Sequence, residues 1–170
     1  YPFNLWPYGD LASDDCLKGG SGTTDTGYHD VEVWSTLTST RGELDELWYR
    51  LYCAISRCNR AIISLNDYGA EVLGEETAAI RMGEVKFLRA HFYFKLLTMF
   101  RQIPWITEDA VLNGTHESIR NDEYSYEELF SLVIADFEEA YNVLPEVPAD
   151  GGRTHKIAAA AYLAKCYLTL

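Results

Sequence analysis

Apolar side chains recur at steps of three and four residues in four separate segments of this 170-residue chain. That spacing is the period of an α-helix with one buried face. The segments are residues 44–65, 75–101, 125–144 and 154–168. In the first segment the stripe consists of Leu44, Leu47, Trp48, Leu51, Ile55, Cys58, Ile62 and Leu65. The sequence therefore predicts an all-α fold built on four helices.

The second segment carries apolar residues on almost every side. A helix of this kind must be covered by neighbouring elements. His91 lies inside the second segment, so we expect a hydrogen-bonded core histidine there rather than a ligand-binding one. The alanines of residues 154–168 permit close contact between helices, and this segment reaches Leu170 without Gly, Pro or a polar cap. We therefore expect further chain to pack on its apolar face.

Local signals predict where the helices begin and end. Thr40-Arg41-Gly42-Glu43 has the form of a capping box, as does Ser125 with Glu128. Asn66-Asp67-Tyr68-Gly69 is expected to end the first helix, and Thr154 to cap the fourth. Residues 101–121 are expected to form an extended excursion that contains a turn at Asn113-Gly114.

The four helices group into two pairs. Within each pair the helix starts lie about 30 residues apart, close to the roughly 34-residue unit of tetratricopeptide repeats. The standard Trp-x2-Leu-Gly-x2-Tyr signature is absent. We therefore predict a loop-rich leader in residues 1–40, followed by two tetratricopeptide-like helical hairpins in residues 41–170. Stacked helical pairs provide surfaces for binding.

Charge and motif content exclude several classes of function. Lys and Arg number 14 against 26 Asp and Glu, so the formal net charge is 14 − 26 = −12. Such a chain repels nucleic acid and anionic lipid. The sequence lacks nucleophile-elbow, P-loop, dinucleotide-binding and His-Glu-x-x-His motifs. The four cysteines form no CxxC pair, so we expect no metal and no cofactor.

The leader contains the side chains that sugar recognition needs. A pyranose ring stacks its apolar face on an aromatic side chain, and carboxylate or guanidinium groups bind its hydroxyls. The candidate ligand-binding residues are Asp14, Asp15, Tyr28, His29, Asp30, Trp34 and Arg41. Trp34 follows Val31-Glu32-Val33, so a second interpretation is that it caps the hydrophobic core.

Five segments resemble, in chain order, the SusD/RagB family, whose members are Bacteroidetes surface lipoproteins that capture nutrients for a TonB-dependent outer-membrane transporter. The most specific is Gly83-Glu84-Val85-Lys86-Phe87-Leu88-Arg89-Ala90-His91-Phe92-Tyr93-Phe94, which continues to Ile103-Pro104-Trp105-Ile106-Thr107. The others are residues 13–20, 47–62, 126–145 and 153–168. The resemblance implies a SusD-like α/α superhelix, of which this chain is the N-terminal, tetratricopeptide-like portion.

The resemblance also implies a function. It points to a glycan- or nutrient-binding subunit of the cell outer membrane that is not an enzyme, with a SusC-like TonB-dependent transporter and an oligosaccharide as partners. Membrane attachment would come only from a lipidated cysteine upstream of this sequence. Part of the family's glycan site lies before the helices, so the resemblance favours Trp34 as the sugar platform, flanked by Tyr28 and Asp30.

Two other functions compete with this interpretation. One is an intracellular tetratricopeptide-like adaptor that grips a peptide in a groove. The other is a helical glycoside hydrolase, because the carboxylates are numerous enough for a catalytic pair that meets only in space.

Overall fold

The structure, a computed structural model, describes residues 6–19, 26–34, 38 and 42–170. Within these ranges all regular secondary structure is helical, which confirms the predicted all-α fold. None of the helices in this part of the chain combines the length and apolarity needed to cross a bilayer.

The chain divides into two compact units, Tyr1–Arg50 and Leu51–Leu170, and the boundary falls within helix α2 (Gly42–Ser64). The first unit contains a short 3-10 helix, η1 (Trp6–Tyr8), and α1 (Thr26–Val33). The leader was predicted to be irregular, and α1 corrects that prediction. An eight-residue helix makes only about two turns, which is too few for a helical period to emerge from the sequence.

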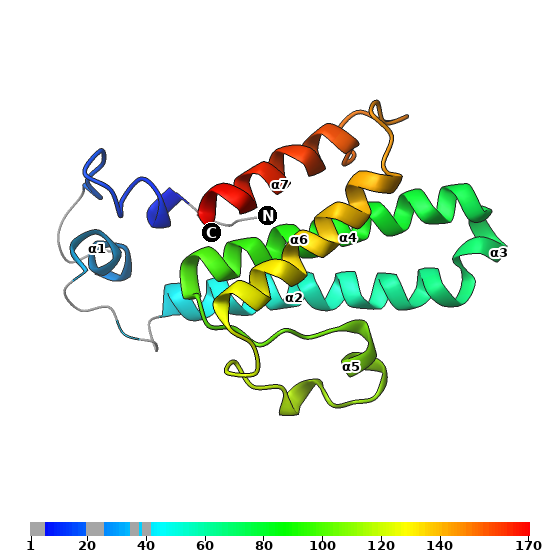
Figure 1. Cartoon of the computed structure of the whole chain (residues 1–170). Helices are drawn as coiled ribbons and strands as arrows, with labels where there is room; N and C mark the ends of the chain where they lie inside the picture. The colour runs from blue at the N-terminus through cyan, green and yellow to red at the C-terminus, as the bar shows by residue number, and fades with distance from the viewer. Residues whose placement is uncertain (1–5, 20–25, 35–37, 39–41) are drawn as a thin grey trace. The chain divides into compact units, whose positions relative to one another are not determined.

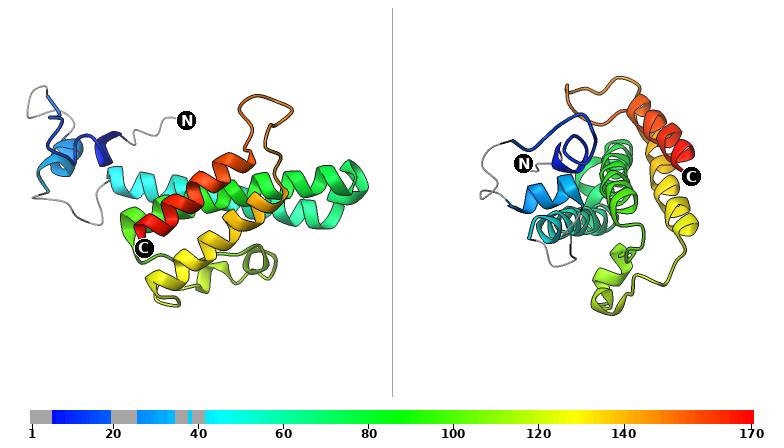
Figure 2. Two further views of the ribbon diagram at one scale, coloured as in Figure 1. Left: turned by 45° about the horizontal axis from the view of Figure 1, so that its top comes forward. Right: turned by 90° about the vertical axis from the view of Figure 1, so that its left-hand side faces the viewer.

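The second unit contains the predicted long helices. They are α4 (Glu75–Phe100), α6 (Tyr126–Val143), α7 (Lys156–Thr169) and the larger part of α2. Helices α2 and α4 lie side by side and antiparallel, α6 crosses α4, and α7 packs on α6 (Figures 1 and 2). All four begin and end close to the predicted segments, because their apolar periodicity is sustained over several turns.

Aromatic side chains join α4, α6 and α7 into one core. The ring of Tyr162 on α7 stacks on Phe137 of α6, with centroids 5.2 Å apart, and meets the edge of Phe87 of α4 at 5.5 Å. Phe87 and Phe137 also pack edge to face at 5.4 Å. Each such pair contributes about 0.5–1.5 kcal/mol beyond the burial of its area. This cluster accounts for the predicted need to cover α4 on several sides.

Helix α2 ends at Ser64, but Asn66–Gly69 does not turn the chain out of its helical path as the sequence predicted. After α2 the chain continues through one π-helical turn, η2 (Leu65–Gly69), and α3 (Ala70–Leu73). Gly69 is buried and keeps helical torsion angles, so it does not act as a stop. The reversal occurs at Gly74, whose φ of +79° is favourable only for glycine.

The excursion between α4 and α6 is partly helical rather than extended. It contains α5 (Glu108–Leu112) and a 3-10 turn, η3 (His116–Ser118). The side chain of Thr107 caps α5 by accepting a hydrogen bond from the Ala110 amide at 3.2 Å. The predicted turn at Asn113-Gly114 is confirmed, since Gly114 has a φ of +67°.

Two of the predicted caps can be compared with the structure. The Ser125 hydroxyl accepts from the Glu128 amide at 3.2 Å, and the Glu128 carboxylate accepts from the Ser125 amide at 2.7 Å, which confirms that capping box. The fourth helix is capped by His155, whose Nδ1 accepts from the Ala158 amide at 3.3 Å. The prediction that Thr154 caps this helix was therefore wrong. The box at Thr40–Glu43 cannot be compared, because Thr40 lies outside the described residues.

A buried ionic network attaches the excursion to the helices. The Arg89 guanidinium, on α4, donates two hydrogen bonds to the Asp136 carboxylate of α6, at 2.7 and 2.8 Å. It donates further to the amide oxygen of Asn59 on α2, at 3.0 Å, and to the carboxylate of Glu108. Asn59 in turn donates to the carbonyl of Ile106 at 2.8 Å. One arginine thus links three long helices with the start of α5.

His91 departs from its predicted environment. Its ring lies against Tyr162, with centroids 5.1 Å apart, and against Phe92 at 5.5 Å. The Nδ1 atom is buried and has no hydrogen-bond partner among the described residues, so the expected hydrogen bond is absent at that nitrogen. Burial lowers the pKa of His91 to about 4, and the charges of Lys95 and Lys165 lower it further.

Candidate functional site

The loop before α1 is folded by its own serine. The Ser13 hydroxyl donates to the Asp10 carbonyl at 2.8 Å and accepts from the Asp15 amide at 3.2 Å. Such local hydrogen bonds are typical of serine in turns. The turn leaves the carboxylates of Asp14 and Asp15 exposed to solvent.

Glu32 attaches this loop to α1. Its carboxylate accepts a hydrogen bond from the Lys18 amide at 3.3 Å and lies 3.4 Å from His29 Nδ1. Sequence reasoning left Glu32 out of the candidate set. The available signal was its position three residues after His29, since residues three apart share one face of a helix. The contact with Lys18 links residues distant in sequence and carried no such signal.

Trp34 closes the C-terminal end of α1 in an unusual conformation. Its amide donates to the Asp30 carbonyl at 3.0 Å, which completes the last turn. Its φ is +57°, in the left-handed region that bulky residues rarely adopt. The side chain is nevertheless 65% exposed. The interpretation of Trp34 as a core residue is therefore not what the structure shows.

The other candidates divide by exposure. His29 is exposed and Tyr28 is half-buried, whereas Asp30 is buried, as is the next residue, Val31. The side chain of Asp30 is thus not presented to a ligand. Arg41 lies outside the described residues. The structure places Asp14, Asp15, His29 and Trp34 at the surface of the first unit, and it does not place Asp30 with them.

This surface combines an aromatic face with hydrogen-bond acceptors. Carboxylates accept at two oxygens, and the last carbonyls of a helix have no partners within the helix. Glu32 and the end of α1 therefore supply acceptors in the same unit as Trp34. Hydroxyl groups are donors that such acceptors can bind. Side chains of these types suit a polyhydroxylated ligand with one apolar face.

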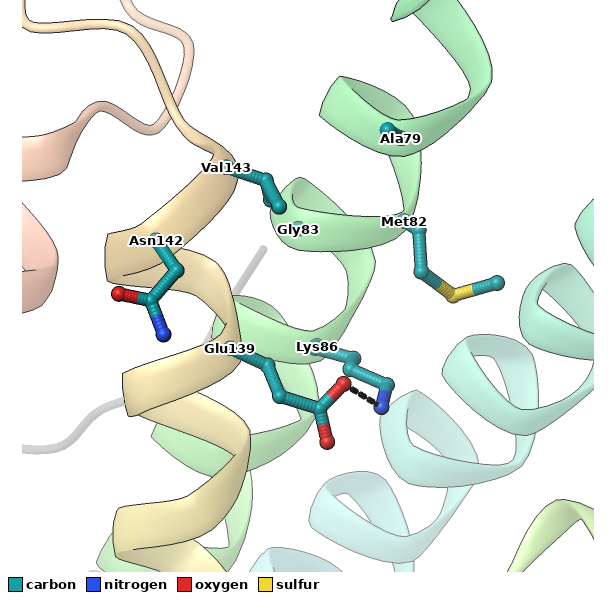
Figure 3. Close-up of a pocket in the computed structure, with 7 residues that line it drawn as sticks. All are labelled: Ala79, Met82, Gly83, Lys86, Glu139, Asn142 and Val143. Carbon is teal, nitrogen blue, oxygen red and sulfur yellow. Dashed lines mark hydrogen bonds and ion pairs between the residues drawn. The ribbon is translucent and has the colours of Figure 1, made fainter. Parts of the chain in front are cut away.

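A separate pocket of about 240 Å³ lies between α4 and α6 in the second unit. Ala79, Met82, Gly83 and Val143 form its apolar wall, with Asn142 on the α6 side (Figure 3). The remaining lining residues, Lys86 and Glu139, form an ion pair with each other (Figure 3). The lining contains no aromatic side chain, so this pocket lacks a platform for a sugar ring.

The part of the chain that the structure describes contains no candidate metal site. There, no three His, Cys, Asp or Glu side chains come together in a way that could hold a metal ion.

Comparison with known proteins decides the family. The family described as "Starch-binding associating with outer membrane", a SusD-like family, matches residues 13–168. This chain belongs to the SusD-like family. The match includes α1, all four long helices and the excursion between α4 and α6.

Two curated SusD-like proteins of Formosa agariphila are similar to the chain. SusD-like protein P25 is 33% identical over 141 residues, which are 81% of this chain and 25% of that protein. SusD-like protein P2 is 28% identical over 137 residues, which are 79% of this chain and 26% of that protein. The chain therefore spans about a quarter of the length of these relatives.

Solved SusD-like structures confirm the helical fold. A laminarin binding SusD-like protein superposes with a TM-score of 0.77 at 29% identity, over 88% of this chain and 31% of that one. A SusD homolog from Bacteroides thetaiotaomicron gives a TM-score of 0.75 at 23% identity, over 89% of this chain and 29% of that one. A structure with xylogluco-oligosaccharide gives a TM-score of 0.67 at 23% identity, over 87% of this chain and 27% of that one.

Proposed function

We propose that this chain is part of a cell-surface subunit that binds oligosaccharides without transforming them and delivers them to a TonB-dependent transporter of the outer membrane. The observation that carries the proposal is the match of residues 13–168 to a family described as starch-binding and associated with the outer membrane. The similarity to a laminarin binding protein supports a glycan as the ligand.

Within the chain we assign sugar binding to the surface around the end of α1. Trp34 is the platform, because its side chain is 65% exposed and a sugar ring stacked on it would cover that apolar face. Its left-handed backbone is the kind of outlier that occurs at functional sites. Tyr28 and His29 flank it, and Asp14, Asp15 and Glu32 accept hydrogen bonds from sugar hydroxyls. Asp30 supports the platform through its backbone carbonyl. Arg41 stays in the proposed set through its place in the sequence.

The charge of the chain favours neutral glycans at this surface. The formal net charge is −12, and the groups assigned to the hydroxyls are carboxylates. An anionic polysaccharide would meet like charge there. Neutral oligosaccharides are therefore the first ligands to test.

The test combines binding with product analysis. The protein is titrated calorimetrically with neutral oligosaccharides, laminarin fragments among them, and each mixture is then analysed for shorter products. Saturable binding without cleavage supports the proposal. Cleavage would identify a hydrolase, and the absence of both binding and cleavage would favour a protein-binding adaptor.

A residue test locates the platform. Trp34→Ala is expected to weaken binding at least about tenfold, equivalent to about 1.4 kcal/mol, while Tm changes by no more than about 2 °C. Trp34→Gly should lose binding to the same extent and keep the fold, because glycine accepts a positive φ. Tyr68→Ala is the matched control, since Tyr68 is 62% exposed but lies in the second unit. A large loss of stability in Trp34→Ala would mean that Trp34 is a residue of the hydrophobic core.

The transporter partnership has its own test. The product of the neighbouring open reading frame should be a TonB-dependent receptor that copurifies with this protein from detergent-solubilised outer membranes. Recovery of the protein free of any such receptor would contradict the partnership and leave glycan binding intact.

A further inference from the structure

One segment of the excursion takes its main-chain hydrogen bonds from side chains. Residues 103–107 belong to no helix, and within the described chain the main-chain groups of residues 103–106 make no hydrogen bond to another main-chain group. Ile103 is 1% exposed and Trp105 is 6% exposed, so the segment is buried. Most main-chain groups pair with other main-chain groups, and a buried group without a partner is costly. The segment therefore depends on partners of another kind.

Those partners are side chains of α2 and α4. The Tyr52 hydroxyl donates to the Pro104 carbonyl at 2.8 Å. Asn59 Nδ2 donates to the Ile106 carbonyl at 2.8 Å. The Tyr93 hydroxyl binds both main-chain groups of Ile106, since it donates to the carbonyl at 3.0 Å and accepts from the amide at 2.8 Å. Two side chains thus satisfy the whole main chain of Ile106.

A slot for one large side chain lies beside these contacts. The Trp105 ring stacks on Tyr93 with centroids 3.9 Å apart, and the guanidinium carbon of Arg89 lies 5.9 Å from the Trp105 ring centroid. Farther along the chain, Arg89 forms an ion pair with Glu108. Hydrogen bonds to the main chain, together with a pocket for a side chain, are the means by which proteins recognise extended peptides.

The recognising side chains are oriented by contacts of their own. Asn59 Oδ1 accepts from Arg89 at 3.0 Å, and Arg89 is held by Asp136 of α6 at 2.7 Å. The rings of Tyr52 and Tyr93 meet edge to face with centroids 6.4 Å apart. These contacts do not involve residues 103–107. The helices therefore preorganise the site, which lowers the entropy lost on binding.

The chain enters the site through a strained turn. Arg101 has φ +60° and ψ −60°, and the Gln102 amide donates to the Phe100 carbonyl at 2.6 Å. This is a γ-turn with positive φ, which is rare and strained. Strain of this kind persists only while the surrounding structure holds it, so release of the segment would relieve it. Beyond α5, residues 113–118 are exposed and do not obstruct such a release.

We propose that Tyr52, Asn59, Arg89 and Tyr93 form a recognition site for an extended peptide, here called the Tyr93 site, and that its ligand is the chain's own residues 103–107. The segment is released and rebound as a unit while the helices stay folded. While bound, it closes the Tyr93 site to peptides of other proteins. The site is separate from the surface assigned to sugar binding, so it stands without the proposed glycan function.

The first test is native-state hydrogen exchange of the wild-type protein at increasing urea concentration, followed by NMR. The Ile106 amide should exchange at least about tenfold faster than the slowest amides of α4, because a local opening suffices. Its rate should depend little on urea, since a local opening exposes little surface. Exchange at the rate and urea dependence of the slowest α4 amides would show that the segment unfolds only with the helices, and would overturn the proposal.

The second test supplies the ligand as a separate molecule. The probe is a peptide of residues 102–109 with fluorotryptophan at the position of Trp105, followed by fluorine NMR. The full chain carrying Pro104→Gly, Trp105→Gly and Ile106→Gly should bind this probe saturably, and the wild type at least about tenfold more weakly, because its site is occupied. Equal binding to both would show a site open to partner peptides. Equal binding, or no binding to the folded triple variant, would refute the proposal.

A matched pair of substitutions locates the contact. Added to the triple variant, Tyr93→Phe should weaken probe binding about tenfold, because both hydrogen bonds to the main chain are lost while the ring remains. Tyr162→Phe is the control, since the Tyr162 hydroxyl has no hydrogen bond with any described residue and its ring packs on Phe137. Equal weakening by both would refute the assigned contact. Melting curves verify folding, and the exchange test on the wild type decides the proposal if the triple variant does not fold.

Discussion

At the scale of single residues, Gly83 marks a close approach of α4 and α6. A Cβ atom built on Gly83 would lie 2.4 Å from Val143 Cγ2, far inside van der Waals contact. Alanine inside a helix normally gains about 1 kcal/mol over glycine, whereas overpacking costs about 1–3 kcal/mol. Gly83→Ala should therefore lower the free energy of unfolding by about 1 kcal/mol in urea denaturation.

The double variant provides the control for this prediction. In a Val143→Ala background the obstructing methyl is gone, so Gly83→Ala should instead stabilise the protein by up to about 1 kcal/mol. A stabilising effect of Gly83→Ala in the wild-type background would mean that the two helices are not this close.

Trp34 shows what could be predicted at this scale and what could not. Its candidacy as a platform needed only the residue type and its place in the leader. Its left-handed backbone depends on α1 ending at Val33, and α1 is too short to be seen as a period. The burial of Asp30 has the same origin, because the direction of its side chain is set by a helix that the sequence did not reveal. The assignment of these residues to sugar binding stays a prediction.

At the scale of helices, the Arg89 network holds the excursion in place. The guanidinium is 5% exposed and Asp136 is 4% exposed, so neither charge is compensated by solvent. Removing one member of a buried ion pair costs about 3–5 kcal/mol, because the other charge is left buried. Glu108 still faces Arg89 in Asp136→Ala, so we expect a loss of about 3 kcal/mol in the free energy of unfolding.

An exposed pair supplies the comparison for Asp136→Ala. Arg120 and Asp122 also form a two-point contact, at 2.8 and 2.9 Å, but both side chains are largely solvent-exposed. Arg120→Ala should leave the denaturation midpoint unchanged, since water and salt screen such pairs. Equal losses in the two variants would refute the assigned difference in burial.

Helix positions could be predicted where apolar side chains repeat with the helical period or where two capping residues stand at a fixed spacing. Helices α4 and α6 were found from apolar side chains that recur over several turns, and the Ser125 box from two residues at a fixed spacing. The continuation past Gly69 was not predictable, because a glycine ends a helix only if its torsion angles allow it. Nor was the pairing of Arg89 with Asp136, which joins residues 47 positions apart and leaves no local pattern.

At the scale of the whole molecule, stability should depend on pH through groups of two kinds. His91 has a folded pKa of about 4, below its ordinary value of 6.5. Between these values the unfolded chain binds more protons than the folded one, so stability falls as pH falls. Burial opposes ionisation of Glu84, but hydrogen bonds from Arg153 and Arg81 outweigh it and lower its pKa. Stability from Glu84 is therefore lost at lower pH, below about 4.5.

These two windows can be separated with His91→Gln. One pKa unit corresponds to 1.36 kcal/mol. After allowance for partial exposure, the wild type should lose about 2 kcal/mol of unfolding free energy as the pH falls from 6.5 to about 4. In His91→Gln this decline should flatten, while the loss below about pH 4.5 persists because Glu84 and its arginines are intact. His116→Gln, at an exposed position of η3, should keep the wild-type profile. If the unfolding free energy of His91→Gln falls with pH as steeply as that of the wild type, the imidazole is solvated. Its burial against Tyr162 of α7 would then be wrong.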